Sequence, residues 1–212
     1  MMFMRQRNVK NKKEIINNAS MVILEPVSMK GKWKNLFNND NPLYIEIGMG
    51  KGDFIYQNAL KYPNINFIGI EKFDSIIALA IKKLPVDPLP NLRLIRMDAL
   101  NIMDVFCHEV DKVFLNFSDP WPKPRHEKRR LTSSEFLMRY ENIFKEKKII
   151  EMKTDNRELF EYSLFSFNKN DYKIEDISLD LHHSDYPDNI MTEYERKFTS
   201  KGNVIYYVKV VK

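Results

Sequence analysis

The sequence is poor in several residue types, and each shortage excludes a class of protein. Cys107 is the only cysteine among 212 residues, which excludes an internal disulfide and a cysteine-based zinc site. No apolar run approaches the ~20 residues that span a bilayer, and the first residues lack the apolar core of a signal peptide. The adjacent residues His182 and His183 could be metal ligands, but no further cluster of ligands accompanies them, so we expect no metal site. These shortages predict a cytoplasmic protein that lies outside membranes, whereas oligomeric state does not follow from them.

Glycine is also scarce, with six in the chain, and Gly48, Gly50 and Gly52 account for three of them. They follow an apolar run over residues 43–47 and precede an expected helix. Glycine allows positive φ and a close approach of the backbone to a ligand, so this density predicts a binding turn. The spacing is Gly-x-Gly-x-Gly, whereas a dinucleotide site has Gly-x-Gly-x-x-Gly.

Positive charge is concentrated in two places. The net charge is +5 and the pI is about 9.1, which permits an anionic partner without requiring one. One cluster of Arg and Lys precedes Glu14, the first acidic residue, and the other spans residues 123–130. Because residues 1–20 lack apolar periodicity, we predict a mobile basic arm there and a single domain over residues 21–212.

From residue 42 onward, strand patterns and helix patterns alternate. Strands are expected over residues 43–47, 65–70, 92–97, 113–117, 148–153, 172–181 and 204–211. Thr132 and Glu135 have capping-box spacing before one helix, and Asp155 is placed to cap the next. The connection over residues 182–202 is long and irregular, so the last two strands should pair antiparallel. We predict an α/β, Rossmann-like, seven-stranded and mostly parallel sheet with helices on both faces, which resembles class I methyltransferases.

Acidic residues stand at the carboxyl ends of four successive expected strands. They are Glu46, Glu71, Asp98 and Asp119. Ligands of such sheets bind at the carboxyl ends of the strands, where four carboxylates would repel a pyrophosphate. They suit a ligand with positive groups and no phosphate, such as S-adenosylmethionine, which has a sulfonium, an ammonium, a ribose diol and an adenine amine. Any one of these acids alone would fit an exposed loop.

Donor and acceptor chemistry assigns a role to three of these acids. Glu71 lies about 20 residues beyond the glycines, where an acid accepts from ribose hydroxyls. Asp98 is expected near the adenine amine. Glu46 is expected to orient the glycine turn or to contact the ammonium through water.

A stiff turn follows the fourth of these strands. Asp119-Pro120-Trp121-Pro122 comes after an apolar run, and the cations from Lys123 to Arg130 follow at once. The prolines limit backbone freedom, so the turn needs little ordering on binding. A carboxylate, a flat ring and a phosphate-binding patch in one segment indicate chemistry on a nucleic-acid base. A rigid surface turn that packs Trp121 on the core would also present Asp119.

The residues around this turn resemble the signature of the tRNA (guanine-N7-)-methyltransferase family. The matching residues are Asn116-Phe117-Ser118-Asp119-Pro120-Trp121-Pro122-Lys123, then His126, Lys128, Arg129 and Arg130. Residues 152–156 (Met-Lys-Thr-Asp-Asn) and 192–198 (Thr-Glu-Tyr-Glu-Arg-Lys-Phe) resemble two further motifs of that family. With the glycine turn, the resemblance covers residues 43–202.

The resemblance implies methyl transfer from S-adenosylmethionine to N7 of a guanosine in the variable loop of tRNA. Asp119 is implied as the catalytic residue and, with Glu46, Glu71 and Asp98, as a cofactor contact; the glycine turn adds Gly48, Gly50 and Gly52. The implied substrate-binding residues are Lys123, Asp155, Thr192, Glu193, Tyr194 and Glu195. The implied RNA contacts are Arg125, His126, Lys128, Arg129 and Arg130.

The chemistry of guanine N7 limits what Asp119 can do. N7 carries an in-plane lone pair and is unprotonated at neutral pH, so its attack on a methyl group needs no general base. We expect Asp119 to orient the reactants and to stabilise developing positive charge. A deep A-form groove hides N7, so the target should be a looped or splayed base. Thr192, Tyr194 and Glu195 are expected to line its pocket, with Glu195 accepting from guanine N1 and N2, although Tyr194 fits core packing nearly as well.

Three other functions remain open at this point. An amino-group methyltransferase acting on adenine in RNA has a related Asp/Asn-Pro-Pro-Tyr/Trp turn, but Trp121 replaces the second proline here. A non-catalytic RNA-binding module gains nothing from four acids at strand ends. A dehydrogenase is disfavoured because the same acids would repel its pyrophosphate.

Overall fold

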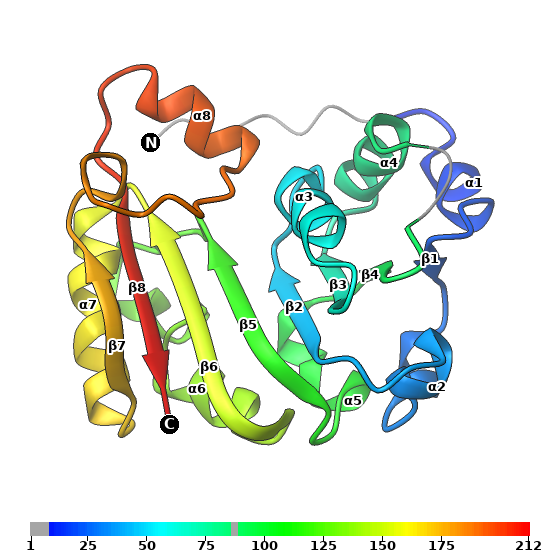
Figure 1. The fold of residues 1–212 in the computed structure, drawn as a ribbon, viewed down its shortest axis with the longest axis horizontal. Helices are drawn as coiled ribbons and strands as arrows, with labels where there is room; N and C mark the ends of the chain where they lie inside the picture. Colours follow the sequence, from blue (N-terminus) through cyan, green and yellow to red (C-terminus); the bar gives the residue numbers. More distant parts are fainter. Residues whose placement is uncertain (1–8, 86–88) are drawn as a thin grey trace.

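One mixed sheet carries the fold (Figure 1). The protein is described here by a computed structural model that covers residues 9–85 and 89–212. Within these residues the strand order is β1-β4-β3-β2-β5-β6-β8-β7. The strands are β1 Val22–Ile23, β2 Leu43–Ile47, β3 Asn66–Glu71, β4 Leu92–Arg96, β5 Val110–Asn116, β6 Phe144–Thr154, β7 Lys173–Ser178 and β8 Tyr206–Val211.

The pairing of the strands confirms the predicted α/β class. The pairs among β1 to β6 are parallel, and β8 pairs antiparallel with both β6 and β7. The described sheet has eight strands rather than the seven predicted, because β1 pairs with β4 through Val22 and Ile23. A strand of two residues is too short for alternation to be recognised in a sequence.

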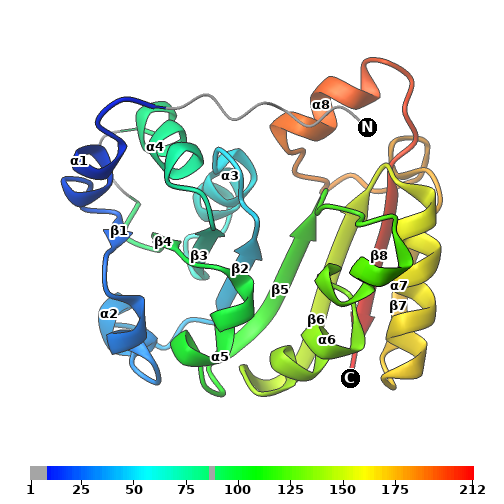
Figure 2. The ribbon, with the colours of Figure 1, turned by 180° about the vertical axis from the view of Figure 1, so that it is seen from behind.

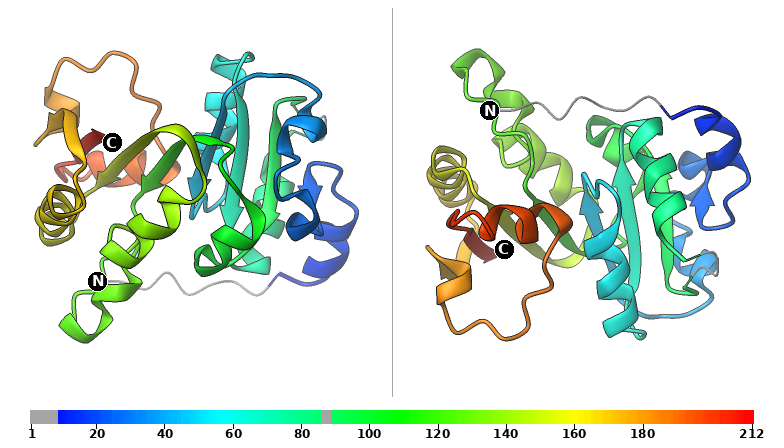
Figure 3. Two further views of the ribbon diagram at one scale, coloured as in Figure 1. Left: turned by 90° about the horizontal axis from the view of Figure 1, so that it is seen from below. Right: turned by 90° about the horizontal axis from the view of Figure 1, so that it is seen from above.

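Helices cover both faces of the sheet (Figures 2 and 3). The helices are α1 Lys12–Asn17, α2 Trp33–Phe37, α3 Asp53–Lys61, α4 Asp74–Lys83, α5 Ile102–Val105, α6 Ser134–Glu141, α7 Arg157–Lys169 and α8 Glu193–Thr199, with 3-10 turns η1 Pro26–Met29, η2 Ala99–Asn101, η3 Pro124–Arg129 and η4 Leu181–His183. Residues of α2, α5, α6 and α7 share one core, in which Ile68 of β3 is buried. Residues of α1, α3 and α4 share the other core, in which the adjacent Phe67 is buried. This alternation along β3 shows a strand buried on both faces.

The helix starts correct two details of the sequence analysis. Helix α7 is capped by Asn156, whose side chain accepts from Leu159 N at 2.7 Å, so the prediction that Asp155 caps it is wrong. Helix α6 begins where predicted, but Ser133 caps it, and the Thr132 hydroxyl bonds to Ser163 instead. Both errors are shifts of one residue among adjacent capping types.

The connection between β7 and β8, residues 179–205, is called the late loop below. It was expected to be irregular, yet it contains helix α8 with a complete capping box. Thr192 Oγ1 accepts from Glu195 N, and the Glu195 side chain accepts from Thr192 N. A hydrogen bond of 2.8 Å between Leu181 N and Ile205 O closes the loop at its base.

Part of the predicted N-terminal arm forms regular structure. Helix α1 lies within residues 1–20, and Ile16 is buried against the core that includes α4. Residues 1–8, which include the basic Arg5 and Arg7, lie outside the described residues. In the part of the chain that the structure describes, no helix is both long and apolar enough to cross a membrane.

Candidate active site at the strand ends

The carboxyl ends of β2, β3, β4 and β5 meet at the upper edge of the sheet in Figure 1. Glu46 lies in β2 and Glu71 ends β3, while Asp98 and Asp119 follow the ends of β4 and β5. The register pairs Glu46 with Gly69 on one side and with Phe114 on the other. The parallel fold therefore brings the four predicted acids to one edge of the sheet.

The three glycines of the turn after β2 have different surroundings. Gly48 has φ +78° and Gly50 has φ +58°, and a Cβ added at either would meet no atom within 4 Å. Gly52 caps α3, and a Cβ there would lie 3.3 Å from Leu84 Cδ1 of the segment after α4. The first two glycines thus line open space beside the strand ends, whereas Gly52 allows α3 and α4 to pack closely.

Glu71 is held by the backbone around it. Its Oε1 accepts from Lys72 N at 2.8 Å and from Phe73 N at 3.1 Å, and its Oε2 accepts from Gly50 N at 3.2 Å. Burial raises the pKa of this carboxyl, the three hydrogen bonds oppose that shift, and the charge of Asp119 adds to it. Glu71 therefore ties the glycine turn to the end of β3.

Glu46 is the most buried of the four acids. Its side chain accepts from Asn116 Nδ2 at 2.9 Å through Oε1, while Oε2 is buried with no hydrogen-bond partner within the described residues. Burial raises the pKa of Glu46 to about 7, although Asn116 and Lys153 act to lower it. The Ile55 backbone N–H lies near enough to lower this pKa as well, but it makes no hydrogen bond of full geometry with the carboxyl. A buried acceptor without such a bond costs free energy, so Oε2 is placed to accept from a bound donor.

Asp98 is fixed by a cation and by a helix start. Its side chain accepts from Leu100 N at 3.0 Å and pairs with Lys72 Nζ at 2.6 Å. Burial acts to raise the pKa of Asp98, but the hydrogen bonds from Lys72 and from the Leu100 backbone lower it. The carboxylate is thus ionised and oriented at the end of β4.

Asp119 is exposed and stands within a strained turn. Phe117 has φ +52° and Trp121 has φ +42°, so left-handed residues with large side chains flank the acid. Arg130 donates to the carbonyl oxygens of Pro120 and Trp121. The carboxylate therefore stands at the tip of a turn whose backbone is held by the Arg130 side chain.

The basic run after this turn divides into cations of different surroundings. Arg125 and Lys123 are exposed, while Lys128 pairs with Glu135 at 2.8 Å. The Arg129 guanidinium lies 4.9 Å from the Trp121 ring centre. Desolvation and the charges of Arg129, Arg125 and Lys123 lower the pKa of His126, which favours its neutral form.

Glu195 of α8, which was expected to line the pocket of the target base, is held by groups of the protein itself. Its side chain is fully buried, and its oxygens meet Lys153 Nζ at 3.2 Å, His182 Nε2 at 3.1 Å and Asn189 Nδ2 at 2.7 Å. Burial lowers the pKa of Lys153, and the Glu195 carboxylate opposes that shift. Glu195 therefore joins the late loop to β6 from beneath.

Tyr194 and Glu193 connect α8 to segments on both sides of the strand ends. The Tyr194 hydroxyl donates to Asp155 Oδ2 at 3.1 Å, and its ring lies 4.8 Å from that of Phe117. Glu193 pairs with Lys51 at 2.6 Å and with Lys83 at 2.8 Å, which belong to the glycine turn and α4. Figure 1 shows α8 above the ends of β5, β6 and β8.

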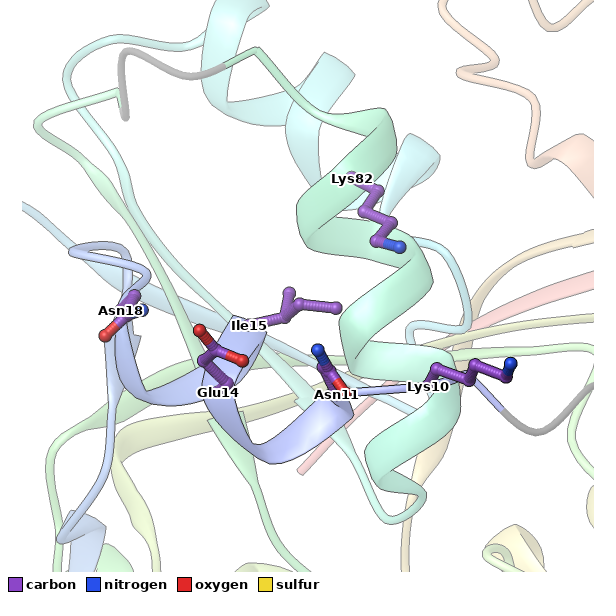
Figure 4. A pocket seen from close by; sticks show the side chains of 6 residues that line it. All are labelled: Lys10, Asn11, Glu14, Ile15, Asn18 and Lys82. Atoms are coloured by element: carbon purple, nitrogen blue, oxygen red, sulfur yellow. The ribbon is translucent and has the colours of Figure 1, made fainter.

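Two hollows in the described residues are lined by other residues than the four acids. One, of about 300 Å³, is formed by the late loop and includes His182 and Asn189, which also contact Glu195. The other, of about 460 Å³, lies between α1 and α4, where Figure 4 shows Ile15 pointing toward α4. Across residues 9–85 and 89–212, no group of three or more His, Cys, Asp or Glu side chains is arranged to hold a metal.

Comparison with known proteins decides the family. Residues 40–208 match the model of a family described as putative methyltransferase. A tRNA (guanine-N(7)-)-methyltransferase from Bacillus licheniformis is 52% identical over 196 residues, which is 92% of each chain. One of that name from Lachnoclostridium phytofermentans is 50% identical over 205 residues, or 96% of each chain. The chain belongs to the tRNA (guanine-N7-)-methyltransferase family.

A solved structure supports the fold of this family member independently of close sequence similarity. The 16S rRNA methyltransferase KamB superposes with a TM-score of 0.64 over 85% of this chain and 92% of its own, at 14% identity. At that identity the likeness concerns the fold alone. It agrees with the parallel sheet and the antiparallel β8 of this methyltransferase.

Several residues that shape the site of this methyltransferase have no predicted role from the sequence. Asn116 and Lys153 fell within matched motifs but received no role, although each contacts a buried carboxylate. A polar residue at the end of an apolar strand was the available signal for both. The pairing of Lys51 and Lys83 with Glu193 had no local signal, since 142 and 110 residues separate the partners.

Proposed function

We propose that this chain transfers the methyl group of S-adenosylmethionine to N7 of a guanosine in the variable loop of tRNA. The observation that carries the proposal is the pairing of a close family match with an exposed Asp119 after β5, at the same sheet edge as the buried acids Glu46 and Glu71. Relatives about half identical over nearly the whole chain bear the name of this activity.

The described residues fit S-adenosylmethionine. The partnerless Glu46 Oε2 supplies a buried acceptor for a cationic or N–H donor. Gly48 and Gly50 leave open space where a side chain would otherwise stand. Glu71 and Asp98 retain acceptor capacity for the ribose hydroxyls and the adenine amine, since a carboxylate has about four acceptor positions. When bound, this cosubstrate supplies an activated methyl group on a sulfonium.

Asp119 acts by charge and orientation in this proposal. Guanine N7 attacks through its own lone pair, so the protein needs to align it with the methyl group and hold that alignment. The methylated ring gains positive charge, and a carboxylate fixed beside it stabilises the charge as it develops. The strained turn holds Asp119 in place before substrate arrives, so little reorganisation is needed.

The substrate residues divide into those that face outward and those that support them. Lys123 and Arg125 are exposed cations suited to phosphates, and Arg129 combines charge with the Trp121 ring. Asp155 and Tyr194 bond to each other near Phe117. Glu195 supports the late loop rather than the base, because its oxygens already accept from four groups.

Methyl transfer to unmodified tRNA, followed by nucleoside mapping, tests the proposal. The expected product is N7-methylguanosine at a single variable-loop position. N6-methyladenosine as the product would establish the amino-group alternative instead. Binding of tRNA without transfer, and no heat of binding with S-adenosylmethionine, would establish a non-catalytic module.

A further inference from the structure

Arg130 stands in the basic run that the family resemblance assigns to RNA, yet it points into the protein. Its Nε donates to Pro120 O at 3.1 Å and to Trp121 O at 3.3 Å, and its Nη2 donates to Trp121 O at 3.1 Å. The side chain is half-buried, whereas its neighbours Lys128 and Arg129 are exposed. Two of its nitrogens are therefore engaged with the backbone of the turn that carries Asp119.

That turn needs a donor from elsewhere. Pro120 and Pro122 have no N–H, so the turn lacks two of the donors that could close hydrogen bonds within it. Trp121 adopts φ +42°, a conformation that persists only where the surroundings hold it. The planar fork of an arginine can bond two adjacent carbonyl oxygens at once, which a lysine ammonium cannot do with the same fixed geometry.

Arg130 is in turn fixed from below by α7. Its guanidinium lies 4.1 Å from the ring centre of Tyr162. The Tyr162 hydroxyl donates to Glu127 Oε1 at 3.0 Å, and its ring packs partly against the core. A continuous set of contacts thus links the core through Tyr162 and Arg130 to the backbone beside Asp119.

We propose that Arg130 is a positioning residue for Asp119 rather than an RNA contact, and that it sets the rate of methyl transfer by holding the Pro120–Trp121 carbonyls. This inference rests on the proposed role of Asp119. It separates the basic run into outward cations that bind phosphates and one inward cation that shapes the catalytic turn.

The test compares Arg130→Lys with Arg125→Gln in single-turnover methylation and in tRNA binding at several salt concentrations. Arg130→Lys keeps the charge and removes the fork, so we expect the rate at saturating tRNA to fall about tenfold or more. Its tRNA affinity and salt slope should stay within about twofold of wild type. Arg125→Gln should weaken tRNA binding and reduce the salt slope by about 1.

A double variant shows whether Arg130 acts through Asp119. If it does, Asp119→Asn with Arg130→Lys should be no slower than Asp119→Asn alone, because the positioned group is already lost. Lys145→Gln, an exposed cation at the other end of β6, serves as the control for charge and should match wild type. Tyr162→Leu removes the ring under the guanidinium without touching a charge and should lower the rate in the same way to a smaller extent.

Several outcomes would overturn the inference. Loss of tRNA affinity with an unchanged saturated rate in Arg130→Lys would make Arg130 an RNA contact. If the rate loss of the double variant equals the product of the two single losses, Arg130 acts independently of Asp119. A fully active Asp119→Asn would instead remove the proposed role of Asp119 itself, and the inference with it. Circular dichroism of each variant establishes that folded proteins are being compared.

Discussion

The two halves of the site hold their carboxylates by different means. In the first half, at the ends of β3 and β4, Glu71 and Asp98 accept from backbone N–H groups one or two residues away, with Gly50 and the Lys72 side chain as the more distant donors. In the half formed by β5, β6 and the late loop, Glu195 accepts from the side chain of Lys153, 42 residues away. Glu71 and Asp98 therefore depend mainly on nearby backbone donors, whereas the pair between Glu195 and Lys153 forms only when the late loop has met β6.

Because of this contrast, we expect the loss of Glu195 to lower the free energy of unfolding more than the loss of any other acid of the site. Truncation to alanine leaves the buried Lys153 ammonium without a carboxylate partner, although Asn189 Oδ1 and Ile190 O still accept from it, and removes the capping box of α8. We expect Glu195→Ala to lower the free energy of unfolding by about 3–5 kcal/mol, measured by urea denaturation. Its neighbour Glu193→Ala, which loses only exposed pairs, is the matched control. A cost below about 1 kcal/mol would show that both halves are equally local.

Asp119 tests whether the exposed acid of the second half carries the chemistry. Asp119→Asn keeps the size of the side chain and removes its charge, so the stabilisation of the methylated ring is lost. We expect the single-turnover rate to fall about 100-fold, with the free energy of unfolding unchanged because the side chain is exposed. Full activity with unchanged binding of S-adenosylmethionine would contradict the assignment.

Glu46, the most buried acid of the first half, should give the free energy of unfolding a measurable pH dependence. Its folded-state pKa is about 7 against an ordinary 4.5, so between these pH values the folded state holds a proton that the unfolded state has lost. The stabilisation is present below pH 4.5 and is lost as the pH rises through 7, by up to about 3 kcal/mol. Glu46→Gln should remove this decline and weaken binding of S-adenosylmethionine.

Denaturation at pH about 5 and about 8 measures the Glu46 effect. The stability of Glu46→Gln relative to wild type should rise between these two conditions. Glu146→Gln, at an exposed position of β6, should show no such change. Equal pH dependence of the Glu46 variant and wild type would mean that Glu46 is not the group responsible.

Glu193 joins the two halves and should show the smallest effect. Its pairs with Lys51 and Lys83 are partly exposed, with side-chain exposures of 47% for Glu193 and about 40% for the lysines. Glu193→Gln should cost at most about 1 kcal/mol of unfolding free energy, and the cost should vanish at high salt. A larger loss that persists at ~1 M salt would show that the halves depend on this link.

The same contrast explains what could be predicted from the sequence. Apolar alternation, glycine spacing and acids after strands are local signals, and they located the sheet and the acids of the first half. Helix α8 was missed although Thr192 and Glu195 have capping-box spacing, because no long apolar period accompanies them. Arg129 and Arg130 are identical neighbours in the sequence, and only tertiary contacts separate them: Arg130 bonds to the Pro120 and Trp121 carbonyls and lies over Tyr162 of α7, whereas Arg129 lies over the Trp121 ring.

The hydrogen bond between Leu181 and Ile205 has a consequence for how this fold can change over time. It holds the two ends of the late loop together at the sheet edge, so residues added between these ends need not move the strands. Doubling the length of a closed loop costs only about 0.6 kcal/mol of closure entropy. Insertions between η4 and Asn189 could therefore accumulate and change which RNA is bound, while the contacts of Lys153 and the acids at the strand ends stay intact.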